Sequence, residues 1–353
     1  MKPAERIDTV VNLEVPDRVP IAPEIWGDYA ARVAGITFYD ICSDMKKADY
    51  AMEMLLKTYG ELDMVYPLFM IRPYKNNWKM SHGQMQYIEE ELIGQDLYDE
   101  IVQKGYSETY NLKREAATFK AELSSIKPYI VEWEQEREIL LYGGVVGISP
   151  PLESFSLLRS LNEISIDLFR RPEQIIKASD ATIDELIESS MKMAKMAGVP
   201  RIFFGSGRCS ASFFSPIHYE RFVHPYAKRI IQKFAGAGYT IQMHMDGDWT
   251  PMFKYFREFP KKKCILHLDG TSDIFKAKEV LGDRMCIMGD VFAPLLSFGS
   301  THDVVKYCRK LIDICGEDGG YLLSSGCTIP MNAKFENVKT MIDMAKTYGV
   351  YRK

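Results

Sequence analysis

Eight short apolar runs, each followed by a stretch with helical spacing, constrain the fold of this chain more than any other feature. The runs cover residues 18–23, 63–70, 139–148, 201–205, 240–245, 264–270, 285–290 and 321–325. Between the later runs, apolar residues recur every three or four positions, as they do on the buried face of a helix. Eight repeats of strand then helix predict an α/β fold, a closed (β/α)8 TIM barrel. No GxGxxG motif follows an early strand, which argues against a dinucleotide-binding sheet.

The predicted barrel takes up all 353 residues as a single domain, because no linker or low-complexity stretch interrupts it. Residues 81–138 are too many for a simple crossover between strands. They are charged and have helical spacing, so we expect a helical insertion near the barrel mouth.

Composition excludes several classes of function. A net charge of −4 and the lack of a basic run with interleaved aromatic residues argue against a nucleic-acid partner. No apolar stretch approaches the roughly 18 residues of a membrane span, and the first residues lack a secretory h-region. The seven cysteines form no CxxC pair, which suits a reducing compartment. We therefore expect a soluble cytoplasmic protein with neither a nucleic-acid nor a membrane partner.

Polar side chains at the ends of two predicted strands have the pattern of a metal site. His244 and Asp246 are two residues apart and so point the same way on a strand. Cys327 follows the last apolar run at Gly326. An imidazole, a carboxylate and a thiolate form a three-ligand zinc set with one open position, which is typical of catalytic zinc.

Other interpretations of these residues stay open. His244 and Cys327 would also suit a buried core, and Cys327 would suit a thiol nucleophile with His244 as its base. His267 and Asp269 repeat the His-x-Asp pattern one strand later, as ligands, as supporting groups or as core. Two carboxylates, Asp290 and Glu153, are predicted catalytic residues that would act as a base, a substrate contact or a fourth ligand.

Four motifs together resemble the uroporphyrinogen decarboxylase superfamily, in particular its corrinoid-dependent methyltransferase branch. They are Arg-Val-Pro-Ile-Ala-Pro at 18–23, His-x-Asp-Gly-Asp at 244–248, Met-Gly-Asp-Val at 288–291, and Gly-Cys-Thr-Ile-Pro at 326–330 with Glu-Asn-Val-Lys at 336–339. The similarity covers nearly the whole chain and implies a (β/α)8 barrel. True decarboxylases carry an arginine-rich N-terminal segment for the substrate propionates. The matching stretch, residues 18–29, has one arginine and two acids, so decarboxylation is not expected.

The methyltransferase branch holds zinc with a His-x-Cys pair and a cysteine in a Gly-Cys turn, and His244 and Cys327 match those positions. Asp246 stands where the thiol-methylating enzymes have a cysteine. A carboxylate donates less electron density than a thiolate, so the zinc would be a stronger Lewis acid. Such an ion suits cleavage of a methyl ether. The resemblance thus implies the first methyltransferase of an O-demethylase, which moves a methyl group from an O-methyl donor to cob(I)alamin.

Two alternatives accompany this hypothesis: transfer from methylcobalamin to a thiol or a pterin, and a non-catalytic barrel that binds a corrinoid or tetrapyrrole. A methoxylated aromatic donor is suggested by residues near the predicted strand ends, though the aromatic ones would also suit an ordinary core. These predicted substrate-binding residues are Trp26, Tyr29, Tyr66, Phe155, Phe292 and Arg208.

The resemblance also implies a partner. The chain lacks the D-x-H-x-x-G pattern of a cobalamin-binding module, so the cobalamin would arrive on a separate corrinoid protein. Charged runs at 89–91 and 113–115 make the insertion the expected docking surface, and a solvated helical cover is the alternative. Assembly into a homo-oligomer is left open.

Overall fold

Parallel strands surrounded by helices form the body of the protein in this computed structural model, which describes residues 1–70, 78–81, 84–109 and 112–351. Six strands form one sheet in the order β10-β9-β8-β7-β6-β5, and each neighbouring pair is parallel. Their bounds are β5 Gly147–Ile148, β6 Arg201–Gly205, β7 Thr240–Met245, β8 Cys264–Leu268, β9 Cys286–Val291 and β10 Tyr321–Ser325. A parallel pair, β1 (Met64–Val65) with β4 (Leu140–Leu141), continues the ring.

Backbone hydrogen bonds close this ring on both sides of the segment at residues 20–22. The N–H of Ala22 donates to Leu323 of β10 at 3.0 Å, and the carbonyl of Ile21 accepts from Asp63 at 3.0 Å. On the other side, β4 and β5 are two parts of the predicted strand 139–148. Seven of the eight predicted runs contain strands, and the run at 18–23 forms isolated bridges at Arg18 and Ile21. The α/β fold is consistent with the predicted (β/α)8 barrel.

The third barrel strand breaks at Gly143 and Gly144 for a steric reason. Both have positive φ, at 62° and 69°. A Cβ on Gly144 would lie 2.6 Å from the carbonyl oxygen of Arg201, and one on Gly143 would lie 2.8 Å from the Phe203 ring. Only glycine fits this close approach of two strands. The strand resumes at β5, which pairs with β6.

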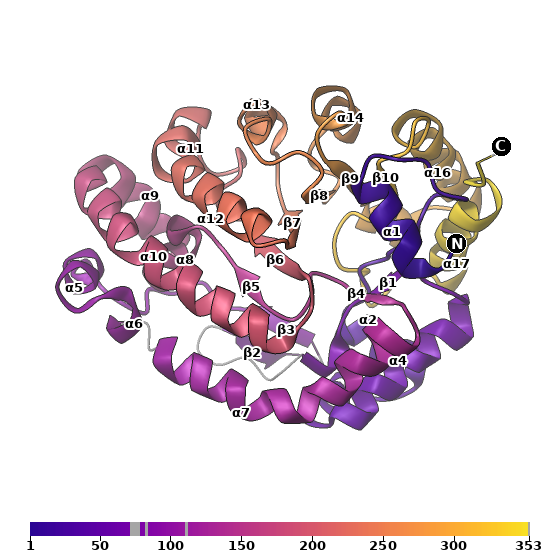
Figure 1. The fold of residues 1–353 in the computed structure, drawn as a ribbon, viewed down its shortest axis with the longest axis horizontal. Helices are drawn as coiled ribbons and strands as arrows, with labels where there is room; N and C mark the ends of the chain where they lie inside the picture. Colours follow the sequence, from indigo (N-terminus) through magenta and orange to yellow (C-terminus); the bar gives the residue numbers. More distant parts are fainter. Residues whose placement is uncertain (71–77, 82–83, 110–111, 352–353) are drawn as a thin grey trace.

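Helices cover the outside of the barrel, and Figure 1 shows them arranged around the strands. In chain order they are α2 Gly27–Ala34, α3 Phe38–Ser43, α4 Met45–Tyr59, α8 Pro151–Arg159, α9 Leu161–Arg170, α10 Pro172–Ala197, α11 Pro216–Phe222, α12 His224–Gly236, α13 Phe253–Phe256, α14 Ile274–Leu281, α15 Ala293–Phe298, α16 Thr301–Cys315 and α17 Phe335–Thr347. Helix α1 (Pro3–Val11) differs, because its Ile7 and Val10 pack with Ile265 and Leu322 near the N-terminal ends of the strands. It therefore covers the end of the barrel opposite the carboxyl ends of the strands.

The predicted insertion contains helices α5 (Leu97–Lys104), α6 (Tyr106–Thr109) and α7 (Leu112–Val131), followed by a π-helical turn, η2 (Glu132–Glu136). Figure 1 shows α7 running beside α10, with which it is in contact. An antiparallel hairpin, β2 (Trp78–Ser81) with β3 (Gln84–Tyr87), overlaps the start of this segment, and the sequence pattern did not predict it. Within the described residues, no helix combines the length and apolar character needed to cross a membrane.

Candidate metal centre

Three side chains at the carboxyl ends of β7 and β10 converge on one point. The Nε2 atom of His244 lies 3.2 Å from Oδ1 of Asp246 and 3.6 Å from Sγ of Cys327. One ligand atom from each residue lies within 4.8 Å of the other two, so the set is close enough to hold one ion. Gly326 permits this arrangement, because a Cβ there would lie 2.4 Å from the carbonyl oxygen of Asp269. The structure therefore brings together the three predicted metal ligands.

The charges around His244 favour a cation. Burial lowers the pKa of His244, but the carboxylates of Glu24 and Asp246 outweigh burial and raise that pKa well above its usual value. Burial tends to raise the pKa of Asp246, but His244 lowers it to about 2. Burial, followed by the charge of Glu24, raises the pKa of the Cys327 thiol to about 11. Without a further positive charge the thiol stays protonated near neutral pH, which argues against a free thiolate nucleophile.

A second group of side chains surrounds the other ring nitrogen of His244. Its Nδ1 lies 2.9 Å from Nδ1 of His267, 3.2 Å from the hydroxyl of Tyr142 and 3.5 Å from Oε2 of Glu24. All four side chains are buried. Burial, followed by the charge of His244, lowers the pKa of His267 to about 3, so that its ring is neutral. Glu24, His244 and His267 form a second candidate ion-binding group that shares His244 with the first.

The sequence marked Glu24 only as one of several polar residues at strand ends, and it assigned no role to Glu24 or Tyr142. Glu24 follows the first barrel strand, so its position at a strand end was an available signal. Tyr142 lies in an apolar run beside two glycines, and nothing in that pattern marks it. The register of β7 and β8 pairs His267 with His244, so His267 belongs to the cluster rather than to an ordinary core.

Glu153 and Arg208 lie beside the cluster rather than in it. The backbone N–H of Arg208 donates to Oε2 of Glu153 at 3.0 Å, and burial raises the pKa of Glu153 to about 7. The adjacent Gly207 adjoins Asp246, since a Cβ on that glycine would lie 3.3 Å from the aspartate Cβ. The guanidinium of Arg208 pairs with Glu89 and lies 5.1 Å from the centre of the Tyr87 ring. The positive charge of Arg208 is therefore paired with a carboxylate of the insertion.

Asp290 and Phe292 face the helical layer. The carboxylate of Asp290 accepts a hydrogen bond from Tyr307 of α16 at 2.7 Å, and burial raises its pKa to about 7. The ring of Phe292 packs against Tyr307, with centroids 5.4 Å apart. Asp290 is in none of the described groups whose ligand atoms lie close enough to share an ion. The structure thus does not bring the predicted catalytic Asp290 to the metal ligands.

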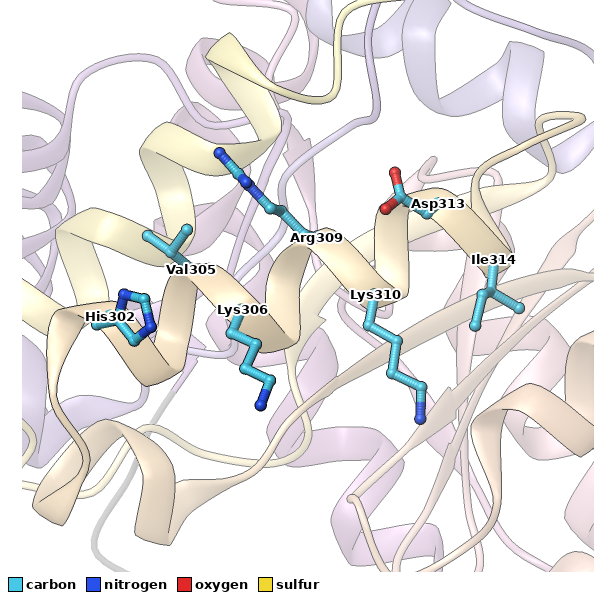
Figure 2. Close-up of a pocket in the computed structure, with 7 residues that line it drawn as sticks. All are labelled: His302, Val305, Lys306, Arg309, Lys310, Asp313 and Ile314. Carbon is cyan, nitrogen blue, oxygen red and sulfur yellow. The ribbon is translucent and has the colours of Figure 1, made fainter.

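Two surface hollows border α16. One, of about 450 Å³, is lined by Phe292, Leu295, Asp303, Lys306, Tyr307 and Lys310. The other, of about 430 Å³, follows the helix itself, and Figure 2 shows its seven lining residues, from His302 to Ile314, along that single element. Neither hollow includes a residue of the His244 cluster.

The other predicted aromatic residues lie in three different surroundings. Tyr66 packs against Tyr142 with ring centroids 5.7 Å apart, which places it beside the cluster. Tyr29 and Phe155 are fully buried in the helical layer, where Tyr29 bonds to the hydroxyl of Tyr59 at 2.5 Å. Trp26 is half-buried against Phe38, with ring centroids 5.6 Å apart. Tyr29 and Phe155 are thus core residues in this structure.

Comparison with known proteins agrees with this architecture. The family model described as uroporphyrinogen decarboxylase matches residues 129–348, which is 220 of the 353 residues. No curated protein sequence matches the chain. Among solved structures, a methyltransferase from Methanosarcina mazei has a TM-score of 0.73 and 18% sequence identity, with 99% of each chain covered. At that identity the likeness establishes the fold.

Proposed function

This chain belongs to the uroporphyrinogen decarboxylase family, and we propose that it acts there as a zinc-dependent methyltransferase. In this proposal a methyl group passes from an O-methyl donor, a methoxylated aromatic compound, to the cob(I)alamin of a separate corrinoid protein. The observation that carries the proposal is the convergence of His244, Asp246 and Cys327 at the carboxyl ends of the barrel strands. The fold shared with the M. mazei methyltransferase supports it.

The donor set suits zinc, because nitrogen, oxygen and sulfur ligands are those that zinc takes in proteins. Bound there, the ion would supply Lewis acidity toward the oxygen from which the methyl group departs. His244 and Cys327 would hold the ion, and Asp246 would keep it more electrophilic than a second thiolate would. Tyr66, beside Tyr142, is the predicted aromatic residue best placed to contact a substrate ring.

The N-terminal segment argues against decarboxylation of a porphyrinogen. Its Arg18 is buried, with one guanidinium nitrogen 2.7 Å from Asp63 and the other 3.1 Å from Glu61. The arginine is thus committed to two carboxylates of this chain. A substrate with several propionate groups would find no free guanidinium at this position.

The direct test supplies the zinc-loaded protein with free cob(I)alamin and a panel of donors: methoxybenzoates, methanol and methylamines. We expect methylcobalamin to form with a methoxybenzoate, seen as a change in the cobalamin absorbance spectrum. The reverse assay offers methylcobalamin to a thiol or a pterin. Fast demethylation by a thiol, without turnover of any ether, would reject the proposed direction. Cobalamin binding without zinc and without turnover would instead support a non-catalytic barrel.

Asp246→Cys is expected to retain zinc but slow ether demethylation about tenfold, or ~1.4 kcal/mol in activation free energy. The physical reason is that a second thiolate makes the ion a weaker Lewis acid. Zinc content and the rate of methylcobalamin formation are measured together. The control is Asp248→Cys on the same loop, whose carboxylate accepts from the Thr250 N–H and is in none of the described ion-binding groups. An Asp246→Cys enzyme as fast as the wild type would contradict the role given to the carboxylate.

The structure indicates which charged residues of the insertion are suitable for a test of corrinoid-protein docking. Two carboxylates of its acidic run are used internally, because Glu89 pairs with Arg208 and Glu91 with Arg159. The side chains of residues 113–115 lie outside the described residues. Exposed lysines on α7, Lys120 and Lys127, are therefore the better residues for charge reversal.

The double variant Lys120→Glu/Lys127→Glu is expected to slow methyl transfer to the corrinoid protein several-fold while sparing transfer to free cobalamin. Transient interfaces of this kind are small and polar, so reversed charges act mainly on association. The matched control is Lys306→Glu/Lys310→Glu on α16, whose side chains Figure 2 shows. The insertion is not the docking surface if the α16 variant is the slower one. The same conclusion follows if the insertion variant slows methyl transfer equally to the corrinoid protein and to free cobalamin.

A further inference from the structure

The hydrogen bonds of His267 determine which of its ring nitrogens carries a proton. Its Nε2 lies 2.8 Å from the carbonyl oxygen of Ser325, and a carbonyl oxygen only accepts. The Nε2 atom of His267 is therefore protonated. His267 is completely buried, and burial disfavours a charged ring, so Nδ1 of the neutral ring carries a lone pair.

That lone pair faces His244. The two Nδ1 atoms are 2.9 Å apart, and both residues lie at paired positions on β7 and β8. Two unprotonated nitrogens at this distance would repel each other, so Nδ1 of His244 must carry a proton. The hydroxyl of Tyr142 also contacts Nδ1 of His267. If Tyr142 donates to that lone pair, the His244 proton goes to the Tyr142 oxygen at 3.2 Å or to Glu24. Nδ1 of His244 is protonated in either arrangement.

The consequence appears on the opposite side of the His244 ring. A histidine binds a metal only as the neutral ring. With the proton held on Nδ1, that ring has its lone pair on Nε2, which is the atom that faces Cys327 and Asp246. Metal-binding histidines usually donate the second N–H to a carboxylate, a carbonyl or water. Here the second N–H of the metal-binding histidine faces another imidazole. The hydrogen bonds lead from the Ser325 carbonyl to His267 and then to His244.

We propose that His267 is a positioning residue that directs Nε2 of His244 toward the metal, with the Ser325 carbonyl setting the tautomer of His267. This inference deepens the proposed function and rests on the metal site assigned there. It gives His267 a defined task, whereas the sequence left this residue between ligand, supporting group and core.

The first experiment requires no metal. Protein labelled with 15N-histidine contains six histidines, and His244→Asn and His267→Asn spectra assign the two signals. We expect an exchange-protected proton on Nδ1 of His244, and on Nε2 but not Nδ1 of His267. A His244 proton found on Nε2 alone would overturn the proposal. Because the spectrum is recorded without zinc, a failure of the proposed zinc function leaves this result interpretable.

The second experiment separates positioning from simple packing with two variants of His267. In His267→Gln the amide can reproduce the Nε2 bond to Ser325 but offers no acceptor at the Nδ1 position. In His267→Asn the amide oxygen can take the Nδ1 position and accept from His244, and the Ser325 bond is lost. Zinc affinity is measured by competition with a chromophoric chelator, and folding by circular dichroism.

We expect His267→Gln to weaken zinc binding 10–100-fold, the range found when supporting partners of metal ligands are removed. His267→Asn should retain most of the affinity. A purely structural role predicts the opposite order, since glutamine keeps the bond to Ser325. If both variants fold and bind zinc like the wild type, or if asparagine is the weaker, the proposal is wrong.

Discussion

Replacing His244 or Cys327 by alanine is expected to reduce bound zinc from about one ion per chain to near zero. Each change removes one of three ligands. The two that remain, Asp246 with either Cys327 or His244, cannot hold the ion tightly. Methyl transfer should fall with the zinc, by at least about 1,000-fold, since the Lewis acid is lost with its ligands. Zinc is measured by mass spectrometry after gel filtration, and activity by methylcobalamin formation.

The matched control for Cys327→Ala is Cys308→Ala. Cys308 is a fully buried thiol in α16 with Val304 and Leu311 as core neighbours on the same helix, so its loss affects packing and not the cluster. It should keep its zinc. Wild-type zinc content in both His244→Ala and Cys327→Ala would show that these residues are not zinc ligands. Loss of zinc in His244→Ala but not in Cys327→Ala would favour the alternative ligand group of Glu24, His244 and His267.

The barrel could be predicted from sequence because most of its strands have a recognisable local sequence pattern. Buried parallel strands are short apolar runs. The strands at 240–245 and 321–325 have the predicted limits, and the run predicted at 264–270 ends as a strand at Leu268. The ends of those strands carry the metal ligands, so period-two alternation was enough to align His244 with Asp246. The hairpin of β2 and β3 was not predicted, because each strand has only four residues and they border a stretch assigned to charged helices.

Local patterns fail where tertiary contacts decide the direction of a side chain. Asp290 shares the parity of Met288, which packs in the barrel interior, yet its carboxylate bonds to Tyr307 of α16. Tyr142 lies in the same interior group as Leu140, and it joins the cluster through contacts with His244 of β7 and His267 of β8. Neither outcome follows from spacing, since each depends on an element far away in the chain. The same holds for Arg208, whose partner Glu89 lies more than one hundred residues earlier.

A buried ion-pair network joins the first two barrel strands and carries the largest expected effect on stability. Asp63 is completely buried and contacts two guanidinium groups, those of Arg6 and Arg18, the latter at 2.7 Å. Its Oδ2 also accepts the backbone N–H of Ile21 at 2.8 Å. One buried carboxylate thus contacts two buried cations at the seam that closes the barrel, and the more exposed Asp17 also pairs with Arg6 at 2.6 Å.

Asp63→Asn is expected to lower the free energy of unfolding by about 3–5 kcal/mol, because it leaves two buried arginines without this anion. The amide keeps the size of the side chain, so the loss reports charge rather than a cavity. Urea unfolding followed by circular dichroism measures it, against a total stability of about 5–15 kcal/mol for an ordinary domain. The control is Glu61→Gln, since Glu61 contacts the same two arginines at 3.4 and 3.1 Å but is 55% exposed. Solvent screens that carboxylate, so its loss should cost no more than about 1 kcal/mol. Equal losses of unfolding free energy in the two variants would show that burial of the carboxylate does not determine how much the ion pair stabilises the protein.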